Sequence, residues 1–262
     1  MNIFMHNTAI NNTFRLLKLL SKYNLYLFQT HAPVSVILNF NKGLLKKWLL
    51  TKKYSKEITN FNEAKRNLTL SNDWFSGNLA FWLSIFDNFN YKNKAIKVLE
   101  IGSWEGLSSF FILSTAPNAR LTCVDTWEGA DEHKDGTASP PEVLDKIESV
   151  FDSNLSIFSS RISKFKGTSF SYFCKNSTLK NCYDFIYVDG SHFCNDVVID
   201  AIKSFEMLKV GGILIFDDYL WRFYENATDN PAFAINFFLR QKKGCYKINS
   251  AYYQIAIIKI AE

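Results

Sequence analysis

Acidic residues close two apolar runs in the C-terminal half of the chain. Asp189 ends one run and is followed three residues later by His192, and Asp217 and Asp218 end the next run. Carboxylates that converge repel one another unless protons or a divalent cation lie between them. We therefore expect Asp189, Asp217 and Asp218 to hold one divalent metal of the Mg²⁺ type. The alternatives are a solvated loop at the two aspartates and a packing role for His192.

A turn with two glycines offers a second kind of chemistry. The stretch from Glu100 to Gly106 follows an apolar run, contains Gly102, and leads into an expected helix. Glycine lets a ligand approach the backbone, and a helix N-terminus attracts an anionic group. Glu100, at the end of a buried strand, needs a partner that the amino group of a ligand would supply. A plain structural turn is the alternative.

Asp125 ends the apolar run that follows this turn. It lies about 20 residues beyond the glycines, where a carboxylate can bind the ribose hydroxyls of a nucleoside. A helix-capping role is the alternative for Asp125. Trp127 offers an aromatic face either to a base or to the protein core.

These residues need a sheet to bring them together. From residue 96 onward, β-rich runs alternate with helical stretches, which is typical of an α/β fold with a doubly wound, mostly parallel sheet. The expected strands are Ile96–Ile101, Leu121–Val124, Ile162–Phe165, Tyr183–Val188 and Gly212–Phe216. The expected helices are Gly106–Ser114, Glu142–Ser159, Ser169–Lys175 and Asn195–Leu208. The candidate residues should then meet at the carboxyl edge of the sheet.

The two ends of this pattern are marked by a helix and a hairpin. Asn78–Phe89 carries an apolar stripe with helical spacing, and Phe233–Arg240 is helical by the same criterion. Cys245–Ile248 and Tyr252–Ile260 are expected to be strands joined by a turn at 249–251. The sequence therefore predicts a C-terminal antiparallel hairpin and seven strands in all.

The first part of the chain differs from the rest in periodicity and charge. Residues 1–70 are expected to form a helical N-terminal extension, and residues 71–262 the catalytic domain. Nine basic residues precede the first acidic one, Glu57: Arg15, Lys18, Lys22, Lys42, Lys46, Lys47, Lys52, Lys53 and Lys56. The alternatives are a helical cap, an arm on an anionic membrane surface and an organellar transit segment. Nucleic acid is not expected as a partner, because no recognisable reading module is present.

The composition indicates a globular protein in a reducing compartment. Hydrophobic residues make up 47% of the chain, and its five cysteines include no C-x-x-C pair. No stretch approaches the ~18 uninterrupted apolar residues of a transmembrane helix. We expect a cytoplasmic protein, peripheral to a membrane if the basic arm binds one.

Taken in order, these motifs resemble those of the class I S-adenosylmethionine-dependent methyltransferases. The resemblance rests on the turn after Glu100, on Asp125, on Asp189 to His192 and on Gly211 to Tyr219, and it covers roughly Asp73 to Ile260. Within this group the chain is similar to metal-dependent O-methyltransferases of the catechol and macrolide-sugar types. The resemblance implies a Rossmann-like fold whose reversed last strand matches the expected hairpin.

The resemblance also implies cofactor contacts. S-adenosylmethionine would be held by residues from the first three strand ends: Glu100, Gly102 and Gly106 around its methionine part, Asp125 on its ribose and Ser169 near its adenine. Trp104 departs from the commonest glycine-rich loop of the family. The lysine base of the catechol type is not evident, which makes aromatic acceptors less expected.

For the reaction, the resemblance makes Asp189, Asp217 and Asp218 the metal-binding carboxylates and His192 the base. It implies in-line transfer of the sulfonium methyl group to a hydroxyl of a small molecule or glycan. The metal would lower the pKa of that hydroxyl, and His192 would accept its proton. Gly129–Pro141, rich in charged and small residues, is expected to be a lid over the acceptor.

Two other functions compete with this one. An NAD(P)-dependent Rossmann oxidoreductase would share the glycine turn and Asp125, but it should show G-x-G-x-x-G and has no need for Asp217 and Asp218. A non-catalytic scaffold with a degenerate cofactor site is the other alternative, and retention of the whole acidic set argues against it. A homo-oligomer is compatible with the sequence.

Overall fold

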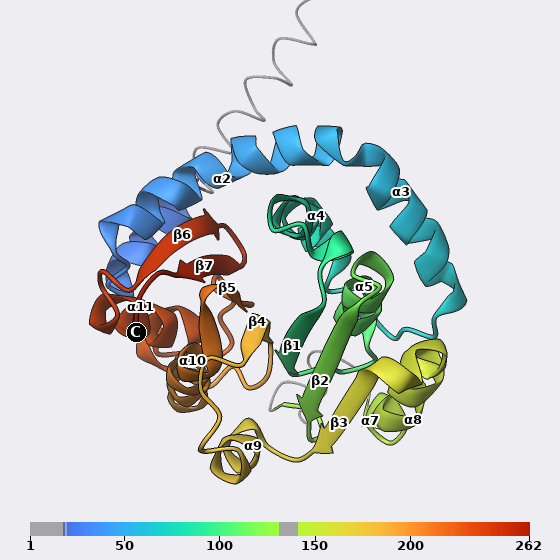
Figure 1. Ribbon diagram of the computed structural model, residues 1–262. Helices are drawn as coiled ribbons and strands as arrows, with labels where there is room; N and C mark the ends of the chain where they lie inside the picture. Colours follow the sequence, from blue (N-terminus) through green and yellow to red (C-terminus); the bar gives the residue numbers. More distant parts are fainter. Residues whose placement is uncertain (1–17, 19, 131–140) are drawn as a thin grey trace, which may run out of the picture.

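Seven strands form one sheet at the centre of the molecule (Figure 1). They are β1 (Ile96–Ile101), β2 (Ala119–Asp125), β3 (Ile162–Lys166), β4 (Tyr183–Val188), β5 (Leu208–Phe216), β6 (Tyr246–Ala251) and β7 (Ile255–Lys259). Their order is β3-β2-β1-β4-β5-β7-β6. The first five run parallel, whereas β7 is antiparallel to β5 and β6 is antiparallel to β7. The expected doubly wound sheet with a C-terminal hairpin is confirmed.

The computed structural model describes residues 18, 20–130 and 141–262. Its α-helices are α2 (Val34–Lys53), α3 (Ser55–Ala64), α4 (Leu79–Asn88), α5 (Leu107–Thr115), α7 (Pro141–Leu144), α8 (Ile147–Asn154), α9 (Ser169–Lys175), α10 (Cys194–Met207) and α11 (Pro231–Gln241). Residues 20–29 are helical as well. Within this part of the chain, no helix combines the length and the apolar character that a membrane crossing requires.

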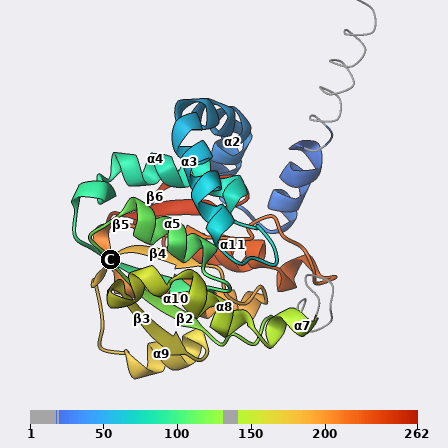
Figure 2. The same ribbon diagram turned by 90° about the vertical axis from the view of Figure 1, so that its right-hand side faces the viewer.

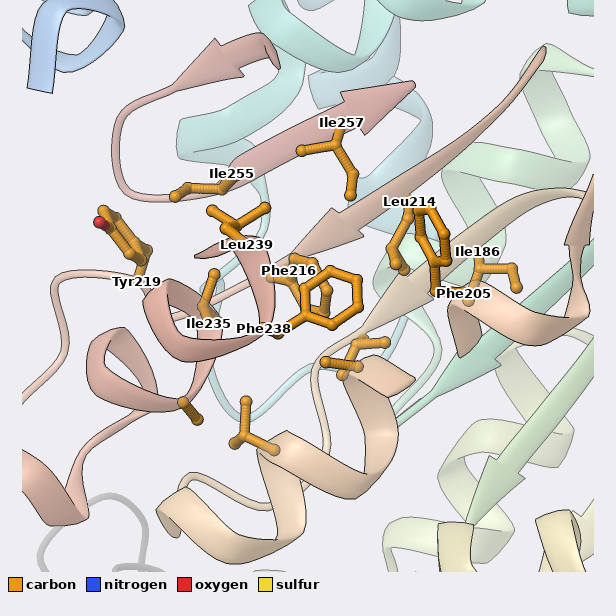
Figure 3. Packing of buried hydrophobic residues seen from close by; sticks show 14 of the residues in the cluster. Ile186, Phe205, Leu214, Phe216, Tyr219, Ile235, Phe238, Leu239, Ile255 and Ile257 are labelled. Atoms are coloured by element: carbon orange, nitrogen blue, oxygen red, sulfur yellow. The ribbon is translucent and has the colours of Figure 1, made fainter. Parts of the chain in front are cut away.

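Both faces of the sheet are buried, which explains why its strands are almost continuously apolar. Leu99 of β1 faces a core formed with α9, α10 and α11, whereas Val98 faces a second core with α4, α5 and α8. Figure 3 shows the first core, where the ring of Phe238 lies 5.5 Å from that of Phe205 and 5.7 Å from that of Phe216. Alternate residues of each strand are thereby fixed on opposite faces.

The N-terminal helices belong to the same packing units as the sheet. Phe40 of α2 lies in the first core and Phe61 of α3 in the second. In Figure 1, α2 and α3 form an arc along the outside of the molecule, from β6 past α4 to α5, and Figure 2 shows them along one side. Residues from both sides of position 70 pack into the same two cores. The domain boundary expected there stays a prediction.

Two expected elements differ from the structure. The helix expected over Glu142–Ser159 is divided into α7, α8 and a 3-10 helix at Ser156–Arg161. The turn expected at 249–251 is wrong, since Ser250 pairs with Ala256 and belongs to β6. A register shift after Ile248 accommodates the polar residues within the strand, and the chain reverses at 252–254 instead.

Candidate active site

The strand order reverses between β1 and β4, where doubly wound folds bind ligands beyond the carboxyl ends of the strands. Gly102 follows β1 with φ of +82°, and a Cβ built there would lie 1.8 Å from the carbonyl oxygen of Asp189. Gly106 precedes α5 with φ of +85°, and its Cβ would lie 2.9 Å from Leu155. The glycine turn is therefore required for close packing of β1 against β4, whatever ligand it also meets.

Glu100 is fully buried beneath the glycine turn. Its carboxylate accepts hydrogen bonds from the hydroxyls of Ser103 at 2.8 Å, Ser108 at 2.6 Å and Ser109. Burial raises the pKa of Glu100, and these hydroxyls counteract part of that rise. The partner that a buried carboxylate needs is thus supplied by three serines, and a direct contact with a cofactor amino group stays a prediction.

Asp125 holds the same turn from the end of β2. Its Oδ2 accepts hydrogen bonds from the backbone N–H of Ser103 at 2.7 Å and of Trp104 at 2.8 Å. Its Oδ1 accepts one from the N–H of Trp127 at 2.7 Å. Trp127 is 4% exposed and packs against Phe151 at 5.1 Å, so its ring is part of the core. Asp125 therefore fixes the loops around the switch point, and its ribose contact stays a prediction.

Ser169 begins α9, immediately after Thr168, whose hydroxyl caps this helix by accepting the N–H of Ser171. Behind it lies Asp200 of α10, a carboxyl that is 1% exposed. Burial raises the pKa of Asp200 to about 7, the hydroxyl of Ser169 lowers it and the charge of Asp196 raises it. The role of Ser169 near adenine stays a prediction.

At the carboxyl ends of β4 and β5, three side chains come together: Asp189, His192 and Asp218 can each present one ligand atom, and these atoms all lie within 4.8 Å of one another. His192 Nε2 is 2.8 Å from Asp218 Oδ2. Asp218 has φ of +52°, a conformation that few residues adopt. The spacing suits a divalent cation held by the two carboxylates, with the imidazole beside it.

Asp217 lies outside this trio, and its carboxylate oxygens are held by other groups. Its Oδ2 accepts hydrogen bonds from Tyr187 and from Gln254 Nε2 at 2.7 Å, and its Oδ1 accepts one from the N–H of Asp218 at 2.7 Å. The structure brings Asp189 and Asp218 together with His192, and Asp217 lies outside this group. That Asp189, Asp217 and Asp218 hold one metal stays a prediction.

Tyr187 connects the two strand ends. Its hydroxyl lies 2.8 Å from Asp189 Oδ2 and also contacts Asp217 Oδ2. A phenol has a single proton to donate, so Tyr187 fully satisfies only one of these two carboxylates at a time. Burial together with the neighbouring carboxylates raises the pKa of Asp189 and of Asp217. In the described residues, no lysine or arginine forms an ion pair with either of them.

A second contact ties this network to the hairpin and to α4. Gln254, in the turn between β6 and β7, donates to Asp217 and accepts the indole N–H of Trp82 at 2.7 Å. Trp82 is fully buried and packs edge-on against Tyr187 at 4.8 Å. The amide therefore fixes the orientation of Asp217 from outside the parallel strands.

A cleft opens over the β4 and β5 ends. It is lined by Val188, Asp189, Gly190, Ser191, His192, Val197, Phe216, Asp217, Asp218, Pro231 and Ile235. Beside it, the ring of His192 lies 4.6 Å from that of Trp221, which stacks on Phe223 at 5.5 Å. The cleft is thus lined by carboxylates, and an aromatic pair packs against the histidine at its wall. None of the residues expected at the cofactor lines it.

The comparison with family models decides between the candidate functions. Residues 99–219, from β1 to the residue after Asp218, match the model of a methyltransferase domain. The chain contains a methyltransferase domain. This confirms the resemblance found in the sequence, and the domain includes every residue of the cluster. No curated protein sequence matches the chain.

Three solved structures share the fold of this methyltransferase domain. A protein of Corynebacterium glutamicum has a TM-score of 0.50 at 17% identity, with 82% of this chain and 97% of that chain covered. A Staphylococcus aureus protein, provisionally named a caffeoyl-CoA O-methyltransferase, has a TM-score of 0.50 at 18% identity, with 82% and 99% covered. The mycinamycin-pathway methyltransferase MycE, in complex with Mg, SAH and mycinamycin VI, has a TM-score of 0.51 at 13% identity. This match covers 82% of the present chain and only 55% of MycE.

Sequence reasoning missed Tyr187 and Gln254 in the methyltransferase domain and its hairpin. Tyr187 stands two residues before Asp189, so the two-residue period of a strand could have placed both side chains on one face. Gln254 carried no such signal, because it was assigned to a strand and lies 65 residues beyond Asp189. The lid expected at Gly129–Pro141 falls on 131–140, outside the described residues.

Proposed function

We propose that this protein is an S-adenosylmethionine-dependent O-methyltransferase that acts on a hydroxyl of a small molecule or glycan with the help of a divalent cation. The observation that carries the proposal is the cluster of Asp189, His192 and Asp218 within a methyltransferase domain. A methyltransferase that needed no cation would have little use for carboxylates gathered in this way. MycE, whose structure holds Mg and SAH, shares the fold and is consistent with the proposal.

The cofactor is proposed to bind outside the switch point between β1 and β4. There the backbones after Gly102 and Gly190 come together, and the carboxylate of Asp125 fixes the turn that would face the methionine part. Asp125 would exchange one of its three backbone hydrogen bonds for a ribose hydroxyl. The proposed contacts of Glu100, Gly106 and Ser169 belong to the same half of the edge.

The residues present fit a divalent cation such as Mg²⁺. Asp189 and Asp218 would supply oxygen ligands, and the charge of the cation would offset the repulsion between these carboxylates. When bound, the cation would lower the pKa of the acceptor hydroxyl. Asp217 is proposed to support the site without binding the cation directly, because Tyr187 and Gln254 donate hydrogen bonds to its Oδ2.

His192 is proposed to accept the proton of the acceptor hydroxyl. Its ring is held between Asp218, which contacts Nε2 at 2.8 Å, and Trp221. The carboxylate stabilises the protonated imidazole, as an orienting acid does in other histidine bases. The aromatic pair Trp221 and Phe223 offers a flat apolar surface to the acceptor, which suits the face of a sugar ring or another extended apolar group.

Two measurements test the proposal. Calorimetric titration of the full chain with S-adenosylmethionine and, separately, with NAD should give binding only for the former; binding of NAD alone would support the oxidoreductase. Methyl transfer from labelled S-adenosylmethionine should then be screened over sugars, nucleotide sugars and phenols, with Mg²⁺ or with excess chelator. Once an acceptor is found, full activity in chelator would contradict the metal site while leaving the methyltransferase assignment in place.

A further inference from the structure

The outer face of α2 is apolar as well as basic. Five large hydrophobic side chains on this helix are more than half exposed: Val34 at 72%, Leu38 at 56%, Leu45 at 63%, Trp48 at 54% and Leu49 at 51%. Leu38 follows Val34 by four residues and Leu45 follows Leu38 by seven, and the last two follow Leu45 by three and four, so all five lie on one side of the helix. The opposite side is buried, since Val36, Phe40 and Gly43 pack inward.

The inner side of α2 is fixed to the domain, so the outer stripe is held in place. A Cβ at Gly43 would lie 2.7 Å from the carbonyl oxygen of Ala251, which shows how closely α2 approaches β6. Lys46 donates to the carbonyl oxygen of Asn249 at 2.7 Å, and Lys47 lies over the ring of Tyr252. Burial lowers the pKa of Lys46 and of Lys47. These two lysines therefore hold α2 against the domain. The positive charges on the outer face come from other lysines.

The charges around the stripe are all positive. Lys42 and Lys52 are exposed beside it, and the ammonium of Lys52 lies 3.8 Å from the ring centre of Trp48. The helix carries no acidic residue. A helix with Trp and Leu between flanking lysines is the pattern of segments that lie in the interface of an anionic bilayer.

We propose that the outer face of α2, defined by Val34, Leu38, Lys42, Leu45, Trp48, Leu49 and Lys52, binds the surface of an anionic lipid bilayer. A second copy of the chain fits this face poorly, because a two-fold contact would set its lysines against one another. Nucleic acid fits poorly as well, since the centre of the stripe is apolar. The bilayer satisfies both features, with headgroups for the lysines and the acyl boundary for Leu45 and Trp48.

The test is co-sedimentation of the full chain with vesicles of phosphatidylcholine alone or mixed with phosphatidylglycerol. We expect binding only to the mixed vesicles, weakened by salt, and about five-fold weaker for Lys42→Gln or Lys52→Gln. The double variant Leu45→Glu/Trp48→Glu should bind at least about ten-fold more weakly. The matched control, Ile157→Glu/Phe170→Glu, changes two side chains that are 75% and 59% exposed elsewhere and should bind normally. Thermal unfolding should show that all variants fold.

Several outcomes would overturn the proposal. Equal binding to neutral vesicles would remove the role of the lysines, and equal loss in the control variant would remove the role of α2. A concentration-dependent dimer in ultracentrifugation that Leu45→Glu/Trp48→Glu abolishes, without vesicle binding, would assign the face to a second copy. Binding to soluble polyglutamate as strong as to the mixed vesicles would assign it to an acidic protein.

Discussion

Two pairs of carboxylates stand at the same edge of the sheet but receive their hydrogen bonds differently. Glu100 and Asp125 lie in the ends of β1 and β2, and Asp189 and Asp218 follow β4 and β5. In the first half, serine hydroxyls and backbone N–H groups surround each carboxylate. In the second half, carboxylates lie near one another, with one phenol shared between two of them and one imidazole beside the third.

The carboxylates of the first half stabilise the fold through their hydrogen bonds, whereas those of the second half are suited to binding a cation. A carboxylate with several N–H and O–H donors is stable in place without a ligand. Carboxylates that lie close together repel one another, and a cation bound between them removes that repulsion. The β4 and β5 half is therefore where the reaction chemistry is expected, and the β1 and β2 half is where the loops are given their shape.

The largest expected effect is at His192. His192→Ala should slow methyl transfer by ~10²–10⁴-fold, because a positioned base contributes about that much, while cation and cofactor affinities are retained. Single-turnover kinetics and calorimetry would measure the two quantities. His31→Ala is the control, since His31 is exposed and lies far along the chain from the cluster. A parallel loss of cation affinity in His192→Ala would make this residue a metal ligand instead of the base.

The next largest effect concerns a carboxyl of a third kind, Asp200, which is buried beside Gly190 and is not one of the three residues of the cluster. Because burial raises its pKa to about 7, the folded chain holds a proton that the unfolded chain releases at lower pH. The resulting stabilisation is present below the ordinary pKa of aspartate and is lost as pH rises through about 7, by up to about 4 kcal/mol.

Asp200→Asn should remove this pH dependence, with no proton left to lose. The free energy of unfolding, measured with urea from pH 5 to 8, should fall in the parent chain and stay flatter in the variant. Glu206→Gln, at a partly exposed position of the same helix, should follow the parent. Identical slopes for Asp200→Asn and the parent would show that Asp200 is already ionised in the fold.

A smaller effect is expected at Asp125. Asp125→Ala should weaken S-adenosylmethionine binding ten-fold or more, since a hydrogen bond to a charged group contributes ~1.5–3 kcal/mol. It should also lower the melting temperature, because the N–H groups of Ser103 and Trp104 lose their acceptor. Asp152→Ala, which removes an exposed partner of Lys164, is the control for both measurements. A lower melting temperature with unchanged affinity would leave Asp125 as a purely structural residue.

The smallest effect is expected at Gln254. Gln254→Leu removes one neutral donor from Asp217 and leaves the indole N–H of Trp82 without its acceptor, so cation affinity should fall by about two- to ten-fold. Calorimetric titration with Mn²⁺ would measure it. Tyr253→Phe, at the neighbouring position of the same turn, should bind the cation normally. Equal affinities in the parent and Gln254→Leu would separate the hairpin from the site.

The fold could be predicted from local patterns because both faces of the sheet are buried. Ile96–Ile101 and Tyr183–Val188 were found with their observed bounds, since continuous apolar runs are typical of parallel strands. The hairpin turn could not be placed in the same way. Asn249 and Ser250 are turn residues by type, and only their pairing with the last strand shows that they belong to β6.

The candidate site could be predicted as a set of strand ends but not as a set of contacts. Sequence position brings Asp189, Asp217 and Asp218 to one edge, because each follows a parallel strand. It does not fix which carboxylate turns inward. That choice depends on Tyr187 and Gln254, whose hydrogen bonds to Asp217 join segments far apart in the chain.

The packing of α2 on β6 has a consequence for the order in which the protein can be made. Lys46 and its partner Asn249 are 203 positions apart, so the inner face of α2 has no strand to cover it until β6 has left the ribosome. During that interval the part of the inner face that packs on β6 is exposed together with the apolar outer face. A nascent chain of this kind is a substrate for chaperones, and early release before β6 and β7 emerge would leave it prone to aggregation.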